Sequence, residues 1–215
     1  MAAADGESGH QTRHFLSNRA IYDSLRRVYG GQARREPDDY YGYSDHRPDI
    51  ALLIEGNLTA LDLKIYDPLG SQPANAGERG AYVACGNTAE AANARVLGRR
   101  ERGSEGDGRY NRRTGEGHVA AVAGDYDRAR EAGVRCVPML IETFGGFGSG
   151  LMGVLRQADG WRQGRLVSSE YDETTWAARN YMAFVTQRIS VAVQISLAQE
   201  IAEALGLSVA ADPRE

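Results

Sequence analysis

Two aspartates and one lysine have types and a spacing that could perform metal-dependent chemistry. Pro48-Asp49 is followed, after a gap of twelve residues, by Asp62-Leu63-Lys64. Carboxylates are the ligands that hard divalent ions such as Mg²⁺ and Mn²⁺ prefer, and a bound ion polarises a phosphate and lowers the pKa of its water. A lysine beside them adds positive charge where negative charge develops. The pattern therefore predicts a site for reactions at phosphate esters.

Lys64 is the only lysine among the 25 basic residues of the chain, the others being arginines. A phosphate loop of the GKS/T type, a Schiff-base enzyme and an SxxK acylase each require a lysine at a defined position. These mechanisms are therefore excluded everywhere except at position 64. The single lysine coincides with the candidate site.

Two predicted strands joined by a tight turn hold the candidate residues. The first covers residues 48–55 and the second residues 58–66, because both are rich in aliphatic side chains. Gly56 and Asn57 suit the two central positions of a hairpin turn, since the first of these positions requires a positive φ.

This turn also predicts the register of the hairpin. Counting outward from its two central residues sets Asp49 opposite Lys64 and diagonal to Asp62, within reach of one shared ion. Because side chains alternate across a strand, the three polar residues share one face, and the aliphatic residues between them fill the other.

The spacing of apolar residues predicts the remaining elements. They are a helix over residues 13–29, an edge strand within 32–37, a short helix within 88–100, a helix over 117–133, a strand ending at Glu142, a short helix within 148–157 and a long amphipathic helix, with or without a break, within 173–206. Strands and helices are interspersed along the chain, which predicts a mixed α/β (α+β) fold.

The length of 215 residues predicts a single domain. We expect a disordered tail (1–12), a core (13–145), a C-terminal helical extension of the same domain (146–206) and a second tail (207–215). Within the core, residues 67–117 carry few large apolar side chains. We expect this segment to form an insertion or a mobile lobe rather than part of the core.

The order of elements, with the acidic residues and lysine on the second and third strands, resembles the PD-(D/E)XK, or restriction-endonuclease-like, nuclease superfamily over residues 13–145. More narrowly, RHF before a helix, then RPD, LDLKIYDPL and an apolar strand with PxxxET.G resemble the endonuclease domains of site-specific non-LTR retrotransposons. The resemblance implies a mixed central sheet flanked by helices. It also implies Mg²⁺- or Mn²⁺-dependent hydrolysis of phosphodiester bonds, with Asp49, Asp62 and Lys64 as catalytic residues.

The resemblance suggests further site residues. In this superfamily the backbone carbonyl between the second acid and the lysine, here that of Leu63, usually joins the two carboxylates as a metal ligand. Related nucleases often place a polar or basic side chain on the next helix, a role open to His118 and Tyr126, with a surface histidine as the alternative. Glu142 is either a third acid or a cap for the following turn. His14 matches a histidine on the first helix of retrotransposon endonucleases.

Seven arginines stand against three acidic residues between positions 95 and 113. They are Arg95, Arg99, Arg100, Arg102, Arg109, Arg112 and Arg113. They form either a solvated face or a clamp for the phosphates of nucleic acid. The formal net charge of -4 argues against a protein that simply coats nucleic acid.

Composition limits the remaining classes. The two cysteines, Cys85 and Cys136, and the four histidines show neither a disulfide framework nor a zinc-ligand spacing. No apolar run reaches the roughly 18 residues of a membrane span, and the N-terminus lacks the apolar stretch of a signal peptide. We therefore expect an intracellular protein that avoids the membrane, nuclear in a eukaryote and otherwise cytoplasmic.

Three functions agree with these observations. The first is a metal-dependent endonuclease acting on DNA and linked to a mobile element. The second is a catalytically inactive, nuclease-like module for nucleic-acid binding or assembly. The third is an accessory subunit whose long C-terminal helix forms a homodimer or docks on a larger complex. The choices between DNA and RNA and between single and double strands stay open, because they depend on loop geometry.

Overall fold

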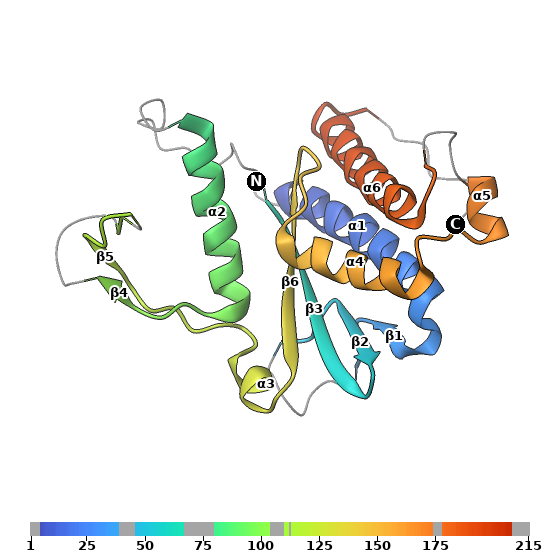
Figure 1. The fold of residues 1–215 in the computed structure, drawn as a ribbon. Helices are drawn as coiled ribbons and strands as arrows, with labels where there is room; N and C mark the ends of the chain where they lie inside the picture. Colours follow the sequence, from blue (N-terminus) through green and yellow to red (C-terminus); the bar gives the residue numbers. More distant parts are fainter. Residues whose placement is uncertain are drawn as a thin grey trace. The chain divides into compact units, whose positions relative to one another are not determined.

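The computed structural model describes residues 5–38, 46–66, 80–103, 110–111, 113–173 and 178–207 and has a mixed α/β fold (Figure 1). In chain order the elements are α1 (Asp5–Tyr29), η1 (Gly30–Gln32), β1 (Ala33–Arg35), β2 (Ile50–Ile54), β3 (Asn57–Tyr66), α2 (Gly80–Leu97), β4 (Arg102–Gly103), β5 (His118–Val119), α3 (Asp127–Glu131), β6 (Arg135–Glu142), α4 (Ser149–Arg162), α5 (Ser168–Glu173) and α6 (Tyr181–Ala204). The predicted mixed class is confirmed.

The chain forms two compact units that interleave in sequence. The first comprises Met1–Arg34, Leu63–Asp67 and Met139–Glu215, and the second comprises Arg35–Asp62 and Pro68–Pro138. The expectation of one core followed by a helical extension is therefore too simple. The division passes through β3 and β6, so each of these strands contributes residues to both units.

The central sheet has four strands in the order β1–β2–β3–β6, and β4 pairs with β5 in a separate two-stranded ribbon. Strands β2 and β3 are antiparallel. Thr143, directly after β6, donates its N–H to the carbonyl of Tyr66, the last residue of β3, at 3.0 Å. The two strands therefore end at the same edge and run parallel, which makes the sheet mixed, as predicted.

The hairpin of β2 and β3 has a different register from the predicted one. Ile54 pairs with Asn57, so Glu55 and Gly56 are the two central residues of the turn. Both have positive φ, 51° and 80°, which is typical of a type I′ turn. The prediction gave the first left-handed position to glycine, whereas glutamate occupies it. The shift is two residues, an even number, so each side chain keeps its predicted face.

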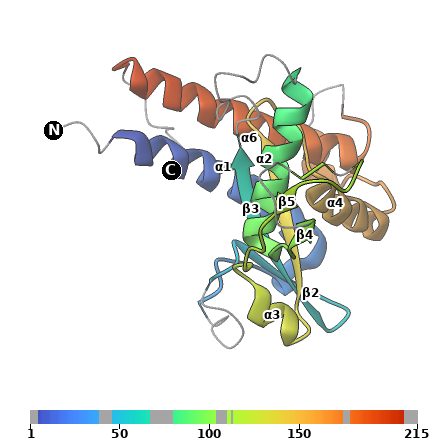
Figure 2. The same ribbon diagram turned by 90° about the vertical axis from the view of Figure 1, so that its left-hand side faces the viewer.

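Three helices of the first unit pack against one another. Helices α1 and α6 run side by side in both views (Figures 1 and 2). Ion pairs join Arg13 to Glu200 at 2.8 Å and Asp23 to Arg188 at 3.6 Å, so the two helices are antiparallel. Their shared core includes Ile21, Leu25, Val185, Ile189 and Val193, together with Leu151 and Leu155 of α4.

The other face of α6 is unusually apolar for a surface helix. Val191, Ile195 and Ile201 of α6 are exposed by 48%, 49% and 52%. Exposed apolar side chains on one helix are often covered by another protein surface. A homodimer or larger complex through this helix therefore stays a prediction. No helix among the described residues has the length and apolarity needed to span a bilayer.

The second unit has a small core of its own. Ala60 of β3, Val96 of α2 and Ala129 of α3 pack with Tyr126 and Val134. The carboxyl end of α2 thus belongs to this core, whereas the expectation that residues 67–117 form an insertion or mobile lobe stays a prediction.

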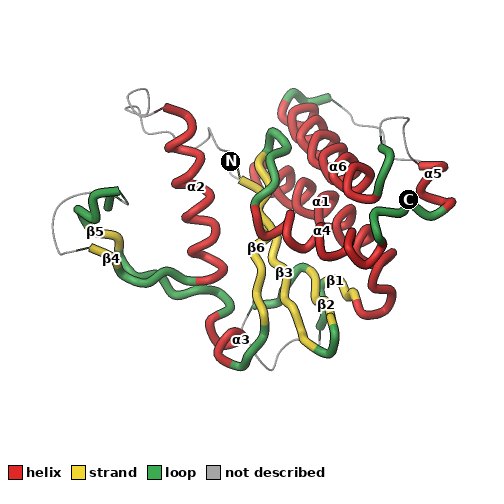
Figure 3. Tube along the Cα trace, in the orientation of Figure 1, coloured by secondary structure: helices red, strands yellow, loops and turns green. Residues whose placement is uncertain are grey.

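Two further boundaries differ from the prediction. Helix α1 begins at Asp5, eight residues before its predicted start, within the segment expected to be a disordered tail. The helix predicted over residues 117–133 is wrong for its first ten residues. His118 lies in the short strand β5, loop follows to Tyr126, and α3 is a single short helix (Figure 3). Glycines at 124 and 133 and the extended pairing of residue 122 interrupt the apolar periodicity there.

Candidate active site

The register of the hairpin, continued by one residue beyond β2, predicts a shared face for the two candidate acids. In the observed register Ile50 pairs with Leu61. Extending it by one residue sets Asp49 across from Asp62, rather than across from Lys64 as predicted. Directly opposed side chains in an antiparallel pair have Cβ atoms roughly 5 Å apart. The corrected register therefore brings the two carboxylates closer than the predicted diagonal arrangement would.

Asp62 is buried, with only 6% of its surface exposed. Tyr126, which is also buried, places its hydroxyl 2.9 Å from Asp62 Oδ1 and 3.1 Å from the carbonyl oxygen of Arg47. Tyr126 was a candidate on the assumption that it shares a helix with His118. It reaches the site instead from the residue just before α3. The Tyr126 side chain therefore covers Asp62, whereas Asp49 is partly exposed.

These residues fit a hard divalent cation. Two opposed carboxylates offer the oxygen ligands that Mg²⁺ and Mn²⁺ take, and the hydrogen bond from Tyr126 fixes the orientation of one of them. No group of three or more histidine, cysteine, aspartate or glutamate side chains is gathered in the described part of the chain. The predicted site has only two carboxylate side chains and one backbone carbonyl, so it does not require a group of three such side chains.

Lys64 and Leu63 belong to the first unit. Lys64 follows Asp62 by two residues along β3, so the two side chains share a face of that strand. Lys64 is half-buried, and Leu63, whose carbonyl is the predicted third ligand, has a fully buried side chain. The predicted trio is thus divided between the units, with both acids in one and the lysine in the other.

Glu142 lies at the end of β6, as predicted. Its carboxylate accepts a hydrogen bond from the Tyr66 hydroxyl at 3.1 Å, and its backbone pairs with Gly146 across the following turn. A Cβ on Gly146 would meet the end of the Glu142 side chain, which would have to move aside. These contacts agree with the expected role at the turn. A role as a third acid stays a prediction.

The two histidine candidates have different outcomes. His118 Nε2 lies 2.8 Å from Glu101 Oε1. This contact links the first residue of β5 to the residue just before β4. It does not share a helix with Tyr126. Its contact with Glu101 agrees with the alternative of a surface histidine. His14 lies on α1 and is half-buried. Its role in the site stays a prediction.

The described arginines of the candidate clamp divide into two kinds. Arg99 Nε donates to the Ala120 carbonyl at 3.1 Å, and Arg95 lies 3.7 Å from an Asp125 oxygen. The side chains of Arg100 and Arg102 are exposed and make no ion pair or hydrogen bond with a described residue. Arg113 is also exposed, and Arg109 and Arg112 lie outside the described residues.

Arg100 and Arg102 line a groove of about 1070 Å³ between α2, the segment after it and α3. Four arginines and four acidic residues line this groove, so its charge is balanced. The local arginine surplus in the sequence therefore does not produce a uniformly basic surface here. Among the four arginines that line the groove, Arg100 and Arg102 are the two that form no bond with a described residue.

The pKa of the Cys136 thiol depends first on burial and then on two charged neighbours, Arg130 and Asp62. Burial raises the pKa of the Cys136 thiol to about 11, the Arg130 guanidinium lowers it, and the Asp62 carboxylate raises it. The raised pKa of the folded state means that this thiol stabilises the fold below its ordinary pKa near 9 and loses that effect as the pH rises through 11. Cys136 can therefore report on Asp62.

We predict that Asp62→Asn lowers the pKa of Cys136. Removing the negative charge favours the thiolate, so alkylation by iodoacetamide in EDTA should become faster at any pH between 8 and 10. Peptide mass spectrometry separates Cys136 from Cys85. Glu55→Gln, the same chemical change on the exposed hairpin turn, should leave the rate unchanged. An identical pH profile in the Asp62→Asn protein would contradict the placement of the two groups.

Comparison with known proteins adds no assignment. Neither a scan against models of protein families nor a search of curated proteins finds a match for this chain.

Proposed function

We propose that this protein is a metal-dependent nuclease of the PD-(D/E)XK class with a restriction-endonuclease-like fold. The observation that carries the proposal is the register of the β2–β3 hairpin, which, continued by one residue, sets Asp49 across from Asp62, with the single lysine of the chain two residues further along β3. The parallel pairing of the third and last sheet strands supports the fold. The link to a mobile element rests on sequence resemblance alone.

Each residue has a defined task in this proposal. Asp49 and Asp62, with the carbonyl of Leu63, would hold Mg²⁺ or Mn²⁺, which supplies a polarised phosphate and a water of lowered pKa when bound. Tyr126 would keep the Asp62 carboxylate in place. Lys64 would orient the attacking water or stabilise the negative charge that develops on the phosphate.

Incubation with supercoiled plasmid tests the proposal directly. Mg²⁺ and Mn²⁺ should each produce nicked or linear DNA, and EDTA should prevent it. Parallel reactions with single-stranded DNA and with RNA identify the substrate. Cleavage of none of these nucleic acids with either metal would sink the proposal.

A second function is favoured by the burial of Asp62. A carboxylate with 6% exposure, hydrogen-bonded to a buried tyrosine, could equally stabilise a module that binds nucleic acid without cutting it. Such a module would bind DNA in the plasmid experiment and leave it intact. Binding without cleavage, unaffected by Lys64→Ala, would support this alternative.

We predict that Arg100 and Arg102 contact phosphates in either case. Arg100→Gln/Arg102→Gln should reduce the slope of log K against log salt for a duplex by about 2, because each phosphate contact contributes about 0.9. Fluorescence anisotropy of a labelled duplex in the Asp62→Asn background measures binding without cleavage.

Arg156→Gln/Arg165→Gln is the matched control. Both arginines are exposed and belong to the first unit. This pair removes the same net charge and should leave the slope unchanged. Equal slopes for the two double variants would show that the groove arginines do not contact phosphate.

A further inference from the structure

The phenol of Tyr126 lies in an unusual position for a tyrosine hydroxyl. Only 1% of the residue is exposed, and the oxygen has two acceptors within hydrogen-bond distance, Asp62 Oδ1 at 2.9 Å and the Arg47 carbonyl at 3.1 Å. A phenol carries one hydrogen, so it donates to one of these oxygens at a time or shares between them. One acceptor is the candidate acid Asp62 itself. The other is the carbonyl of Arg47, two residues before the second candidate acid, Asp49.

The backbone holds this tyrosine in place from both sides. The N–H of Tyr126 donates to the carbonyl of Val96 at 3.4 Å, and that of Asp125 donates to the carbonyl of Arg95 at 2.8 Å. The carbonyl of Tyr126 accepts from Arg130 N at 3.0 Å. These bonds satisfy carbonyl groups at the carboxyl end of α2, which would otherwise have no partner within the helix.

Packing fixes the ring as firmly as the backbone. Tyr126 belongs to the buried core of the second unit, between Val96 of α2 and Ala60 of β3. Gly124, two residues earlier, has no room for a side chain, because a Cβ there would overlap the backbone at Gly98. The end of α2 and the segment before α3 therefore form one rigid support for the phenol.

We propose that Tyr126 is the positioning residue of the site, which orients Asp62 for a divalent cation. This inference rests on the proposed function. The Tyr126 hydroxyl contacts Asp62, which would be a ligand of the ion, and hydrogen bonds of this kind set the orientation of a ligating group. Their loss typically weakens metal binding 10- to 100-fold, as an order of magnitude.

Tyr126→Phe tests the inference, because it removes the hydroxyl and keeps the ring. Titration of the DNA-free protein with MnCl₂, followed by electron paramagnetic resonance of free Mn²⁺, should show a dissociation constant raised about 10- to 100-fold. The Mg²⁺ concentration needed for half-maximal plasmid cleavage should rise in parallel. The rate at saturating Mg²⁺ should change much less.

Tyr181→Phe provides the matched control. Tyr181 is also fully buried, and its hydroxyl donates to the Ser24 carbonyl at 3.1 Å within the first unit. The same atom is lost from a comparable environment, so this variant should bind Mn²⁺ as the wild type does. Melting curves of both variants set a temperature at which each is folded.

The outcomes separate the inference from the proposed function. Wild-type protein that neither binds Mn²⁺ nor cleaves nucleic acid overturns both. Wild-type protein that binds and cleaves, with unchanged Mn²⁺ affinity in Tyr126→Phe, overturns only the role of Tyr126. Equal losses of affinity in Tyr126→Phe and Tyr181→Phe also overturn it, because they would reflect general destabilisation.

Discussion

We expect Asp62→Asn to lower the rate of metal-dependent cleavage of plasmid DNA by on the order of 10³-fold. The substitution removes the negative charge that would hold the cation. It keeps an oxygen that can accept the hydrogen bond from Tyr126 at the same position. The variant should therefore fold as the wild type does, and its thermal unfolding provides the check. Initial rates of conversion of supercoiled plasmid at saturating Mg²⁺ measure the effect.

Glu55→Gln is the control for this experiment. Glu55 lies on the same hairpin, in its exposed turn, and undergoes the same change from carboxylate to amide. Its rate should match the wild type. Lys64→Met should resemble Asp62→Asn, since it removes the cation that stabilises the developing charge. Full activity in the folded Asp62→Asn protein would remove Asp62 from the site.

The faces of the hairpin could be predicted from sequence even though its register could not. The predicted turn began at Gly56, because glycine most readily adopts a positive φ. The observed turn begins at Glu55, with φ 51°. The aliphatic side chains must share one buried face. This requirement excludes register shifts by an odd number of residues but allows shifts by an even number. The sharing of one face by Asp49 and Asp62 therefore survived an error of two residues.

The cover over Asp62 could not be predicted, because it depends on contacts between distant segments. Residues 67–117 have few large apolar side chains, yet Val96 is fully buried and packs with Tyr126. Small residues such as Ala60 let β3 and α2 approach each other closely. The average composition of residues 67–117 therefore does not reveal that the carboxyl end of α2 is buried. The tyrosine was a candidate for the wrong reason, a shared helix with His118.

The arginine cluster shows a similar limit. Sequence counts charges, whereas function depends on which guanidinium groups are already bonded to the protein. Arg99 and Arg130 donate to backbone carbonyls, the latter to Leu97 at 2.6 Å. These bonds depend on where the loop after β5 passes, which no local pattern in the sequence specifies.

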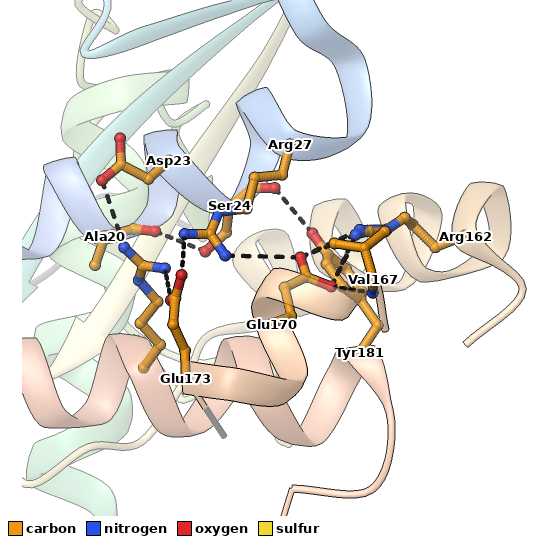
Figure 4. Close-up of polar contacts among 10 residues, drawn as sticks. Ala20, Asp23, Ser24, Arg27, Arg162, Val167, Glu170, Glu173 and Tyr181 are labelled. Atoms are coloured by element: carbon orange, nitrogen blue, oxygen red, sulfur yellow. Dashed lines mark hydrogen bonds and ion pairs between the residues drawn. The ribbon is translucent and has the colours of Figure 1, made fainter. Parts of the chain in front are cut away.

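A second large effect is expected far from the candidate site, at a buried ion pair in the first unit. The Glu170 side chain has no exposed surface, and both of its oxygens face the Arg162 guanidinium at 2.8–3.2 Å (Figure 4). Glu170 also accepts from the Val167 N–H at 2.9 Å. Arg162 lies 5.0 Å from the centre of the Tyr181 ring. The pair joins α4, α5 and α6.

Glu170→Gln should destabilise the first unit by about 3–5 kcal/mol, because Arg162 would remain buried without its counter-charge. For a chain of this size the melting temperature should fall by on the order of 10 °C. Glutamine can still accept the Val167 hydrogen bond, so most of the loss reflects the unpaired charge. Differential scanning calorimetry and urea unfolding measure it.

Two variants test this cause. Glu173→Gln alters an exposed carboxylate of the same short helix, which pairs with Arg27 and Arg188 at 2.8 Å, and should cost at most about 1 kcal/mol. Arg162→Met/Glu170→Gln removes the stranded charge as well and should recover most of the stability lost by Glu170→Gln alone. If the double variant is less stable than Glu170→Gln, the guanidinium contributes through packing on Tyr181 more than through charge. If Glu170→Gln costs no more than Glu173→Gln, the buried pair is not a principal support of this unit.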